Sequence, residues 1–247
     1  MKINHITRLL LLPLLLAACQ EVVVNKYEDN SSLYFYRGAL DARGNGQFDS
    51  LAYSFYLEES GRVRDTLWIE ARLSGFPSAV ARPVPVVQLL TGSDDAVAGQ
   101  HYLSFDDPEI KSLVVLPPNA VKVKLPIVLL REPSLKTTER QLLLEITTNE
   151  YFSVGIQGQR RFLIRFSDLA TQPANWTATW KSVFGDWGAV KMRFIIDYVG
   201  FSDFDATRLL GDMRDYLKVK AKQKLADYEA ANGPLYEDDN VTRVRFP

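Results

Sequence analysis

The stretch that decides the fold is residues 113–130, which read LVVLPPNAVKVKLPIVLL. Over residues 121–125, valine and leucine alternate with two lysines. Because successive side chains of a β-strand point to opposite faces, this alternation predicts a strand with one dry face and one wet face. The sequence Pro117-Pro118-Asn119 breaks the apolar pattern just before that strand and predicts a turn.

The same pattern extends in both directions from this stretch. Short runs rich in β-branched and aromatic residues are separated by turn signals such as Gly44-Asn45-Gly46 and Gly75-Phe76-Pro77. About eight such runs, with no helical period between them, predict a mainly β fold, an immunoglobulin-like antiparallel β-sandwich over residues 33–170. The predicted strands are Leu33–Tyr36, Ser50–Leu57, Arg64–Leu73, Val84–Leu90, Leu113–Leu116, Val121–Leu130, Gln141–Thr147 and Arg161–Phe166.

The pattern changes after residue 170, which predicts a second, smaller domain over residues 171–247, of α+β or purely α structure. Ser202 to Asp205 offer N-cap oxygens and Gly233-Pro234 is a stop signal, so a long helix is expected between them. The predicted apolar face of that helix comprises Leu209, Leu210, Met213, Leu217, Ala221, Leu225 and Tyr228.

Three tryptophans, Trp176, Trp180 and Trp187, stand close together at the start of this second segment. Exposed aromatic rings can stack on sugar rings, and ligand sites combine such walls with a few polar groups. Large aromatic side chains also fill cores, and a small domain needs the area that they bury. These residues are therefore candidate contacts for a ligand or partner, with packing in a core or domain interface as the favoured alternative.

The start of the chain predicts export and a lipid anchor. A short positive segment precedes the apolar run Leu9–Leu16, which is far too short to span a membrane. The sequence Leu16-Ala17-Ala18-Cys19 follows and resembles a bacterial lipobox, in which the cysteine is lipidated and becomes the first mature residue. We expect residues 1–18 to be a lipoprotein signal peptide, Cys19 to carry acyl chains and residues 19–32 to be a tether. The alternative is an ordinary signal peptide with a chance cysteine.

Composition argues against several classes of function. The chain has 247 residues, with 29 Lys and Arg against 30 Asp and Glu, whereas a nucleic-acid-binding protein usually carries a basic excess. Its one cysteine and two histidines leave little material for a disulfide, a metal site or histidine catalysis. We therefore expect a non-enzymatic protein with no cofactor and no metal, which does not bind nucleic acid.

The segment Ala96–Tyr102, together with the strand patterns on both sides of Pro117, resembles the signature of Calx-β-like sandwiches of the immunoglobulin type. His101 stands where those domains usually have an aspartate. Calcium-binding members of that group use clustered carboxylates, whereas the acidic residues here are scattered over loops. The resemblance therefore implies the sandwich fold without a calcium site.

Three further segments, with the lipobox, resemble a family of Bacteroidota lipoproteins that are encoded beside SusC/SusD-type outer-membrane importers. They are Trp180–Gly185, Lys191–Phe194 and Val244–Pro247. The resemblance covers nearly the whole mature chain and implies an accessory or binding subunit of an uptake system for glycans or peptides. It carries over no catalytic residue, because none is established for the family.

The resulting hypothesis is a lipoprotein anchored in the outer membrane by Cys19, with its body at the cell surface and a SusC/SusD-like importer as its partner. A body on the periplasmic side of that membrane is the alternative location. The second hypothesis for function is a stand-alone surface lipoprotein that binds a glycan or peptide. The third is a surface hydrolase, for which the sequence offers no metal set or nucleophile motif.

Overall fold

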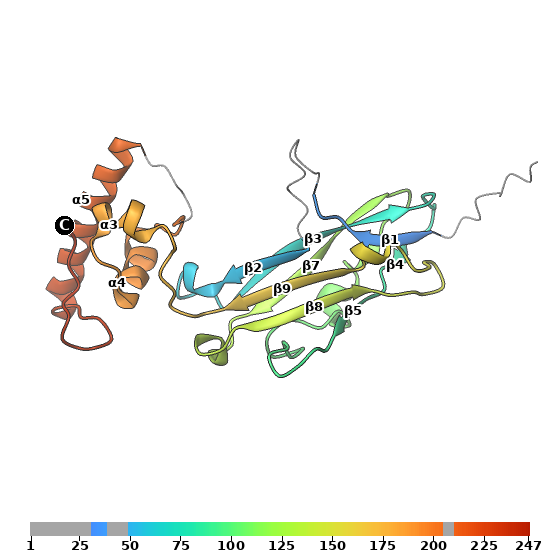
Figure 1. Ribbon diagram of the computed structural model, residues 1–247, viewed down its shortest axis with the longest axis horizontal. Coiled ribbons are helices and arrows are strands. Elements are labelled where there is room, and N and C mark those ends of the chain that lie inside the picture. The colour runs from blue at the N-terminus through green and yellow to red at the C-terminus, as the bar shows by residue number, and fades with distance from the viewer. Residues whose placement is uncertain (1–30, 39–48, 205–209) are drawn as a thin grey trace, which may run out of the picture. The chain divides into compact units, whose positions relative to one another are not determined.

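The alternating stretch of the sequence forms the start of strand β7 (Lys122–Leu130) (Figure 1). Leu125 is buried while Lys122 and Lys124 are exposed, which confirms two faces within the strand. Val121, predicted on the dry face, lies before the strand and is exposed. These positions come from a computed structural model of the chain, which describes residues 31–38, 49–204 and 210–247.

The strands lie in two main sheets and one small sheet. The first main sheet has the order β1-β3-β7 and adds β1 (Ser32–Phe35) and β3 (Arg64–Ser74). The second has the order β2-β9-β8-β5 and comprises β2 (Ser50–Ser54), β5 (Val86–Leu89), β8 (Arg140–Ile146) and β9 (Arg161–Ser167). The small sheet pairs β4 (Arg82–Pro83) with β6 (Val115–Leu116). Each predicted strand overlaps one of these strands, and β4 lies outside the predicted strands.

The prediction of purely antiparallel pairing is wrong for β2, which pairs with β9 in parallel. Ser50 lies opposite Leu163, and Ser54 lies opposite Ser167. A tight turn in the sequence reveals an antiparallel neighbour, because only antiparallel strands can be joined by one. Almost the whole sandwich separates β2 from β9 along the chain, so no turn signal reports the direction of this pair.

Inward-facing side chains of the two main sheets form one hydrophobic core. The rings of Phe35 in β1 and Phe162 in β9 meet there with centroids 5.8 Å apart. Each fully buried side chain of this kind contributes about 1.5–3 kcal/mol to stability. The two sheets therefore pack face to face, through Leu33, Phe35, Ile69, Ala71, Leu125 and Ile127 on one side and Leu142, Leu144, Phe162, Ile164 and Phe166 on the other.

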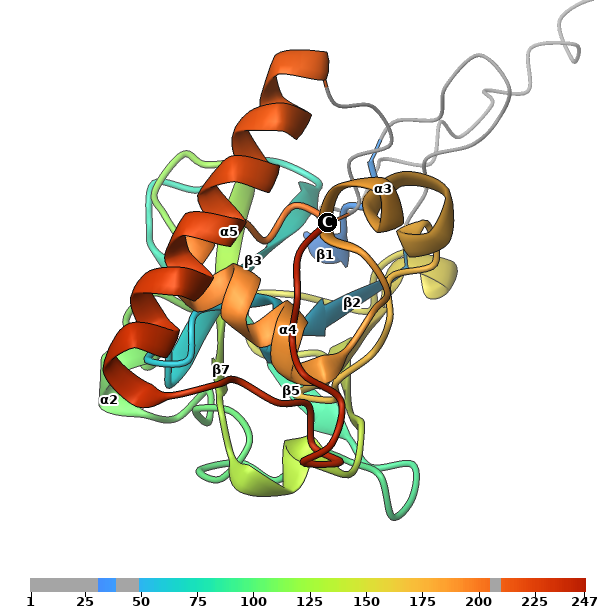
Figure 2. The ribbon, with the colours of Figure 1, turned by 90° about the vertical axis from the view of Figure 1, so that its left-hand side faces the viewer.

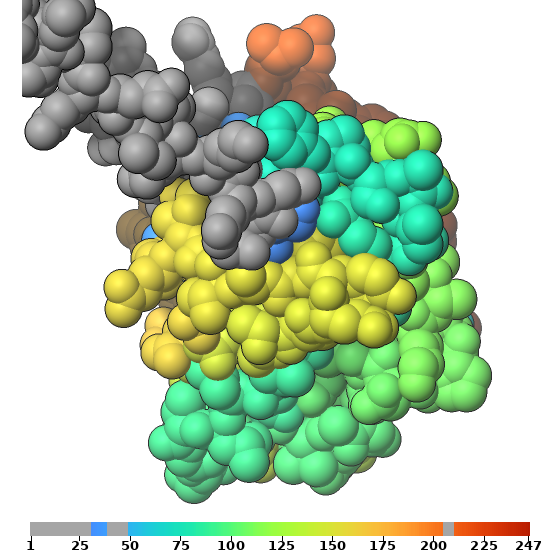
Figure 3. Space-filling model, turned by 90° about the vertical axis from the view of Figure 1, so that its right-hand side faces the viewer, coloured from blue at the N-terminus to red at the C-terminus, as the bar shows by residue number. Residues whose placement is uncertain are grey.

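The loop between β8 and β9 is packed tightly against β1. Figure 3 shows this loop in yellow beside the blue of β1. The Ser153 N–H donates to the Ser31 carbonyl at 2.9 Å, and Phe152 is buried in the core. A Cβ atom on Gly155 would collide with the carbonyl oxygen of Leu33. Only glycine therefore allows the loop to approach β1 this closely.

The segment after residue 170 is helical, so of the two alternatives the structure shows the α one and corrects the α+β one. It contains π-helical turns at Trp176–Trp180 and Ile195–Val199 and the helices α3 (Lys181–Phe184), α4 (Ala189–Phe194) and α5 (Gly211–Asn232) (Figure 2). Over residues 171–204 and 210–247, β-pairing is limited to one antiparallel bridge between Tyr236 and Arg243. With the short helix α2 (Pro108–Lys111) in a loop, the described chain is a mixed fold and not the mainly β fold predicted.

Helix α5 ends as predicted and begins differently. Gly233 has a φ of 81°, and its N–H donates to the carbonyl of Glu229, so the glycine stop is confirmed. Leu217, Ala221 and Leu225 are buried as expected.

The start of α5 differs from the prediction, because the first turns of this helix do not pack against the rest of the helical segment. Leu210 occupies the N-cap position without a side-chain cap, so the predicted cap at Ser202 and Asp203 is wrong. Leu210 and Met213 are exposed although the pattern predicts them on the apolar face. The predicted positions Asp205 and Leu209 lie outside the described residues.

A second hydrophobic core lies among the helices. It includes Trp176, Trp180 and Phe184, together with Val244 from the C-terminal segment. Tyr56, which follows β2, also belongs to this core, so residues of the sandwich segment pack against the helices. The boundary between domains at residue 170 stays a prediction. The predicted signal peptide and most of the predicted tether lie outside the described residues.

Candidate functional site

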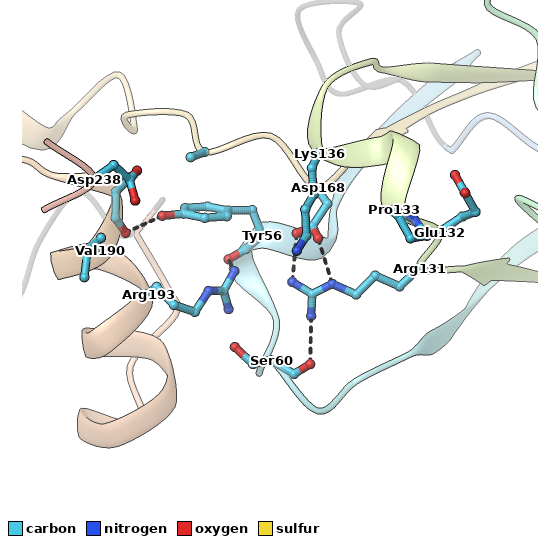
Figure 4. Close-up of a pocket in the computed structure, with 12 residues that line it drawn as sticks. Tyr56, Ser60, Arg131, Glu132, Pro133, Lys136, Asp168, Val190, Arg193 and Asp238 are labelled. Carbon is cyan, nitrogen blue, oxygen red and sulfur yellow. Dashed lines mark hydrogen bonds and ion pairs between the residues drawn. The ribbon is translucent and has the colours of Figure 1, made fainter. Parts of the chain in front are cut away.

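A cleft of about 560 Å³ lies where the ends of the strands meet the helical segment (Figure 4). Strand ends and 3-10 turns supply one wall, and α4 and the C-terminal segment supply the other. Its charged and phenolic lining residues are Tyr56, Arg131, Glu132, Lys136, Asp168, Arg193 and Asp238.

A buried ion pair forms the floor of this cleft. Arg131 follows β7 directly, and Asp168 follows β9, so the ends of strands from both main sheets bring them together. The guanidinium donates two hydrogen bonds to the carboxylate at 2.8 and 2.9 Å and a third to the carbonyl of Glu59 at 2.9 Å. The side chains are 12% and 2% exposed. This two-point geometry holds both strand ends in one position.

Arg193 of α4 joins the helices to the turn that follows β2. Its guanidinium donates at 2.6 Å to the carbonyls of both Tyr56 and Glu58 and lies over the Tyr56 ring, 4.6 Å from the centroid. These carbonyls flank the last residue of the 3-10 turn Phe55–Leu57, where backbone acceptors need partners. Arg193 is therefore committed to holding the two walls together.

The Tyr56 hydroxyl makes a second connection between the walls. It donates to the carbonyl of Ala189 in α4 at 2.5 Å. Burial raises the pKa of Tyr56 to about 12, so the hydroxyl stays protonated and remains a hydrogen-bond donor near neutral pH. Tyr56 thus acts as a fixed part of the cleft wall.

Two charged side chains of the cleft have no protein partner among the described residues. Lys136 is the last residue of the 3-10 turn Pro133–Lys136. Glu132 caps the start of this turn, because its carboxylate accepts the Ser134 N–H at 2.8 Å. Asp238 lies on the opposite wall, in the C-terminal segment. Both are exposed. The cleft therefore offers a ligand one ammonium group and one carboxylate that fold stability does not occupy.

The position of Asp238 is set by the residue before it. Glu237 accepts hydrogen bonds from the backbone N–H groups of Val190 at 2.9 Å and Lys191 at 3.3 Å, at the start of α4. A carboxylate is favourable there because of the unpaired N–H groups and the positive end of the helix dipole. A Cβ on Gly188 would collide with this carboxylate. The C-terminal segment is thus fastened to α4 beside the cleft.

The predicted contacts Trp176 and Trp180 lie in the helical core and not at the cleft. Their indole N–H groups donate to the carbonyls of Gly185 at 3.0 Å and Phe204 at 2.8 Å. The sequence leaves two roles open for these residues, ligand contact and core packing. The structure shows core packing for Trp176 and Trp180, so neither ring is accessible to a ligand. Trp187 is half-buried, and its N–H points to the sulfur of Met192 at 3.3 Å.

The remaining candidates have structural partners. His101 is buried, its Nδ1 accepts the Val97 N–H at 2.9 Å, and its Nε2 lies 3.2 Å from the Ser134 hydroxyl. Burial lowers the pKa of His101, which favours the neutral ring. The described residues contain no group of histidine, aspartate and glutamate side chains that could hold a metal ion. Cys19 lies outside the described residues.

The sequence analysis does not identify the cleft, although one signal for it exists. Arg131 and Asp168 each follow a predicted apolar strand directly, and charged residues at strand ends can converge. Lys136, Arg193 and Asp238 are spread among many similar surface charges and give no comparable signal. Among the described helices, none combines the length and apolarity that crossing a membrane requires.

Comparison with known sequences places the chain in a family. Residues 27–201 match the family described as Domain of unknown function (DUF4843), and the chain belongs to it. No protein with a curated description matches the chain in sequence.

Two solved structures are similar to this chain. One is a proposed carbohydrate-binding protein from Bacteroides ovatus, with 13% identity and a TM-score of 0.36 over 55% of this chain. The other is a two-domain protein of unknown function from Bacteroides fragilis, with 12% identity and a TM-score of 0.32 over 68% of this chain. The chain spans 36% of the first protein and 51% of the second.

Proposed function

We propose that this chain is a non-enzymatic lipoprotein of the bacterial outer membrane that binds a nutrient, a glycan or a peptide, beside a SusC/SusD-like importer. The observation that carries the binding role is the cleft, in which Lys136 and Asp238 are free while the other charged groups are held by the protein. In this proposal the sandwich is of the immunoglobulin type and gives the cleft a rigid frame.

Most ionisable residues of the cleft are held within the protein, and among the described residues only Lys136 and Asp238 are free, which supports binding over catalysis. A general acid or base must be free to exchange a proton with a substrate. Tyr56, Arg131, Asp168 and Arg193 are instead fixed by hydrogen bonds within the protein. These fixed groups make the walls of the cleft rigid, and a site that is already ordered binds a ligand at a lower entropic cost.

The cleft predicts a loss of binding when its free charges are removed. We expect the variant with Lys136→Ala and Asp238→Ala to bind its ligand about tenfold more weakly, since each group would make a hydrogen bond to a polar ligand. The full-length protein, purified in detergent, would be titrated with a library of short peptides and a library of neutral and acidic oligosaccharides.

The matched control is Lys111→Ala, because this lysine is also exposed but lies on α2, away from the cleft. It should leave every affinity unchanged. Absence of binding to both libraries would contradict the binding role. Equal affinities for the cleft variant and the control would show that the ligand is bound elsewhere.

The proposed anchor rests on Cys19 in the sequence Leu16-Ala17-Ala18-Cys19. Each CH₂ group of an acyl chain that enters the bilayer contributes about 0.8 kcal/mol, so lipidation holds the body at the membrane. We expect Cys19→Ser to move the protein from the membrane fraction to the soluble fraction and to abolish labelling by a clickable palmitate. A variant that stays with the membranes would refute the anchor.

The importer is a separate part of the proposal. Protein isolated from outer membranes through a C-terminal tag should bring a SusC/SusD-like pair, identified by mass spectrometry. If the protein binds a glycan or peptide but is isolated alone, the stand-alone lipoprotein becomes the better description. Turnover of a polysaccharide or peptide by the pure protein would replace both with a hydrolase.

A further inference from the structure

The outer face of the sheet β1-β3-β7 carries aromatic and basic side chains, away from the cleft. Residues directly opposite each other in neighbouring strands share a face, so the register defines which side chains lie there. Trp68 of β3 lies opposite Pro126 of β7. Other residues of this outer face include Tyr34 and Tyr36 beside β3, Glu70 and Arg72 in β3, and Lys122 and Lys124 in β7.

Trp68 is the most exposed tryptophan among the four. Its side chain is 56% exposed in the central strand of the sheet, whereas Trp176 and Trp180 are buried and Trp187 is half-buried. Its ring stacks on no other ring, and its indole N–H has no acceptor, within the part of the chain that the structure describes. A buried indole usually has an acceptor, and an exposed one can give its N–H to a ligand.

A fixed arrangement lies next to Trp68 on the same face. The guanidinium of Arg72 lies over the Tyr36 ring, 3.3 Å from its centroid, and donates to the Glu70 carboxylate at 2.6 Å. Cation–π contact and ion pair together hold these three side chains in place. The tyrosine ring and the guanidinium are therefore positioned before any ligand arrives.

The face carries an excess of positive charge. Arg72 and Glu70 neutralise each other, but Lys122 and Lys124 are exposed and have no carboxylate partner among the described residues. Lys124 lies opposite Glu70 and Lys122 lies opposite Arg72, so both ammonium groups project from the same side as Trp68. The chain as a whole has a formal net charge of −1, so this local excess is not a general property of its surface.

We propose that this outer face binds an acidic polysaccharide, whose sugar rings stack on Trp68 while its carboxylate or sulfate groups meet Lys122 and Lys124. This inference goes beyond the proposed function, because it adds a second binding surface, away from the cleft, for one class of nutrient. A peptide that adds a strand would bind at an edge of the sheet and not over Trp68, because the backbone groups of β3 are already paired with both neighbouring strands. A flat aromatic face with cations beside it complements an acidic sugar chain.

The proposal predicts which side chains the affinity depends on. The full-length protein in detergent would be titrated with polygalacturonate and chondroitin sulfate as acidic chains and with dextran as a neutral chain. Trp68→Ala should weaken binding of the acidic chains about tenfold, as truncation of a central aromatic contact does. The double variant Lys122→Gln and Lys124→Gln should weaken it similarly. Added salt should weaken binding by the native protein, because exposed charges are screened.

Tyr216→Ala is the matched control, because Tyr216 is 55% exposed on α5, away from the sheet. It should leave binding unchanged. The double lysine variant keeps the Trp68 ring, so it tests the face even if Trp68→Ala folds poorly. A further readout is Trp68 fluorescence, whose quenching by acrylamide should fall when an acidic chain covers the ring.

Three outcomes would overturn this inference. They are no binding of either acidic chain, equal binding of dextran, and binding that neither the Trp68 nor the lysine variants reduce. The failure of the inference can be separated from failure of the proposed function. If the Lys136 and Asp238 variant loses a ligand while the Trp68 variant keeps it, the cleft binds the nutrient and the sheet face does not.

Discussion

Replacing Trp180 with alanine is expected to lower the free energy of unfolding by about 3–5 kcal/mol, which is the range for deleting a buried tryptophan side chain. Trp180 is fully buried in the helical core. Its ring stacks with Phe184 at 6.0 Å, and the rings of Phe201 and Phe204 lie 4.9 and 5.6 Å away. The substitution removes all three contacts together with the hydrogen bond to the Phe204 carbonyl.

Trp187→Ala is the matched comparison, because it deletes the same side chain from a half-buried position. Trp187 offers less buried area and a weak N–H to sulfur contact, so its loss should cost much less than that of Trp180. Urea unfolding, followed by circular dichroism, would give both free energies. Equal and small losses for the two variants would contradict the placement of Trp180 in the core.

Sequence patterns identify the helical core only in part, and the tryptophans show why. An aromatic residue near a domain boundary can fill a core or form a contact surface. The amino-acid composition of the segment is the same in the two cases, so it does not distinguish them. What decides between them for Trp180 is its distance from Phe201 and Phe204, which follow it after α3 and α4. Trp68 shows the opposite case, since its place in an alternating strand predicts a face but not whether anything covers that face.

The strands are predictable because their signal is local. Alternation around Lys122 and Lys124 assigns β7 and its two faces, since period two is a property of a single strand. The direction of β2 against β9 is not local, because it depends on which strands meet after the chain has crossed the whole sandwich. The start of α5 fails for a similar reason, since Met213 has the right spacing but no neighbouring helix to cover it.

The cleft could not be derived from spacing. Tyr56, Arg131, Asp168 and Arg193 come from four separate elements, and their meeting depends on the packing of the strand ends against α4. A charged residue directly after an apolar strand is a usable signal for Arg131 and Asp168. It does not tell which of the strand ends converge, so it identifies candidates and not the site.

Replacing Arg131 with methionine is expected to lower the free energy of unfolding by about 3–5 kcal/mol, because it leaves a buried carboxylate without its counterion. Asp168 is 2% exposed, and its carboxylate hydrogen bonds come from Arg131. Methionine preserves the aliphatic stem, so the loss reports the charge more than the packing. Thermal and urea unfolding of the single variants measure it.

The opposite substitution, Asp168→Asn, should cost less, about 1–3 kcal/mol, because the guanidinium that it leaves unpaired is less deeply buried than the Asp168 carboxylate. Arg131 would keep the carbonyl of Glu59 as an acceptor and has more access to water. The double variant should then be more stable than Arg131→Met alone, since the unpaired charge is gone.

This order of stabilities distinguishes a buried pair from a surface pair. An exposed ion pair contributes at most about 1 kcal/mol, and its two single variants cost similar amounts. If Arg131→Met and Asp168→Asn prove equally mild, the pair does not hold the two strand ends together. The floor of the cleft would then depend on Arg193 and Tyr56, whose hydrogen bonds join the turn after β2 to α4.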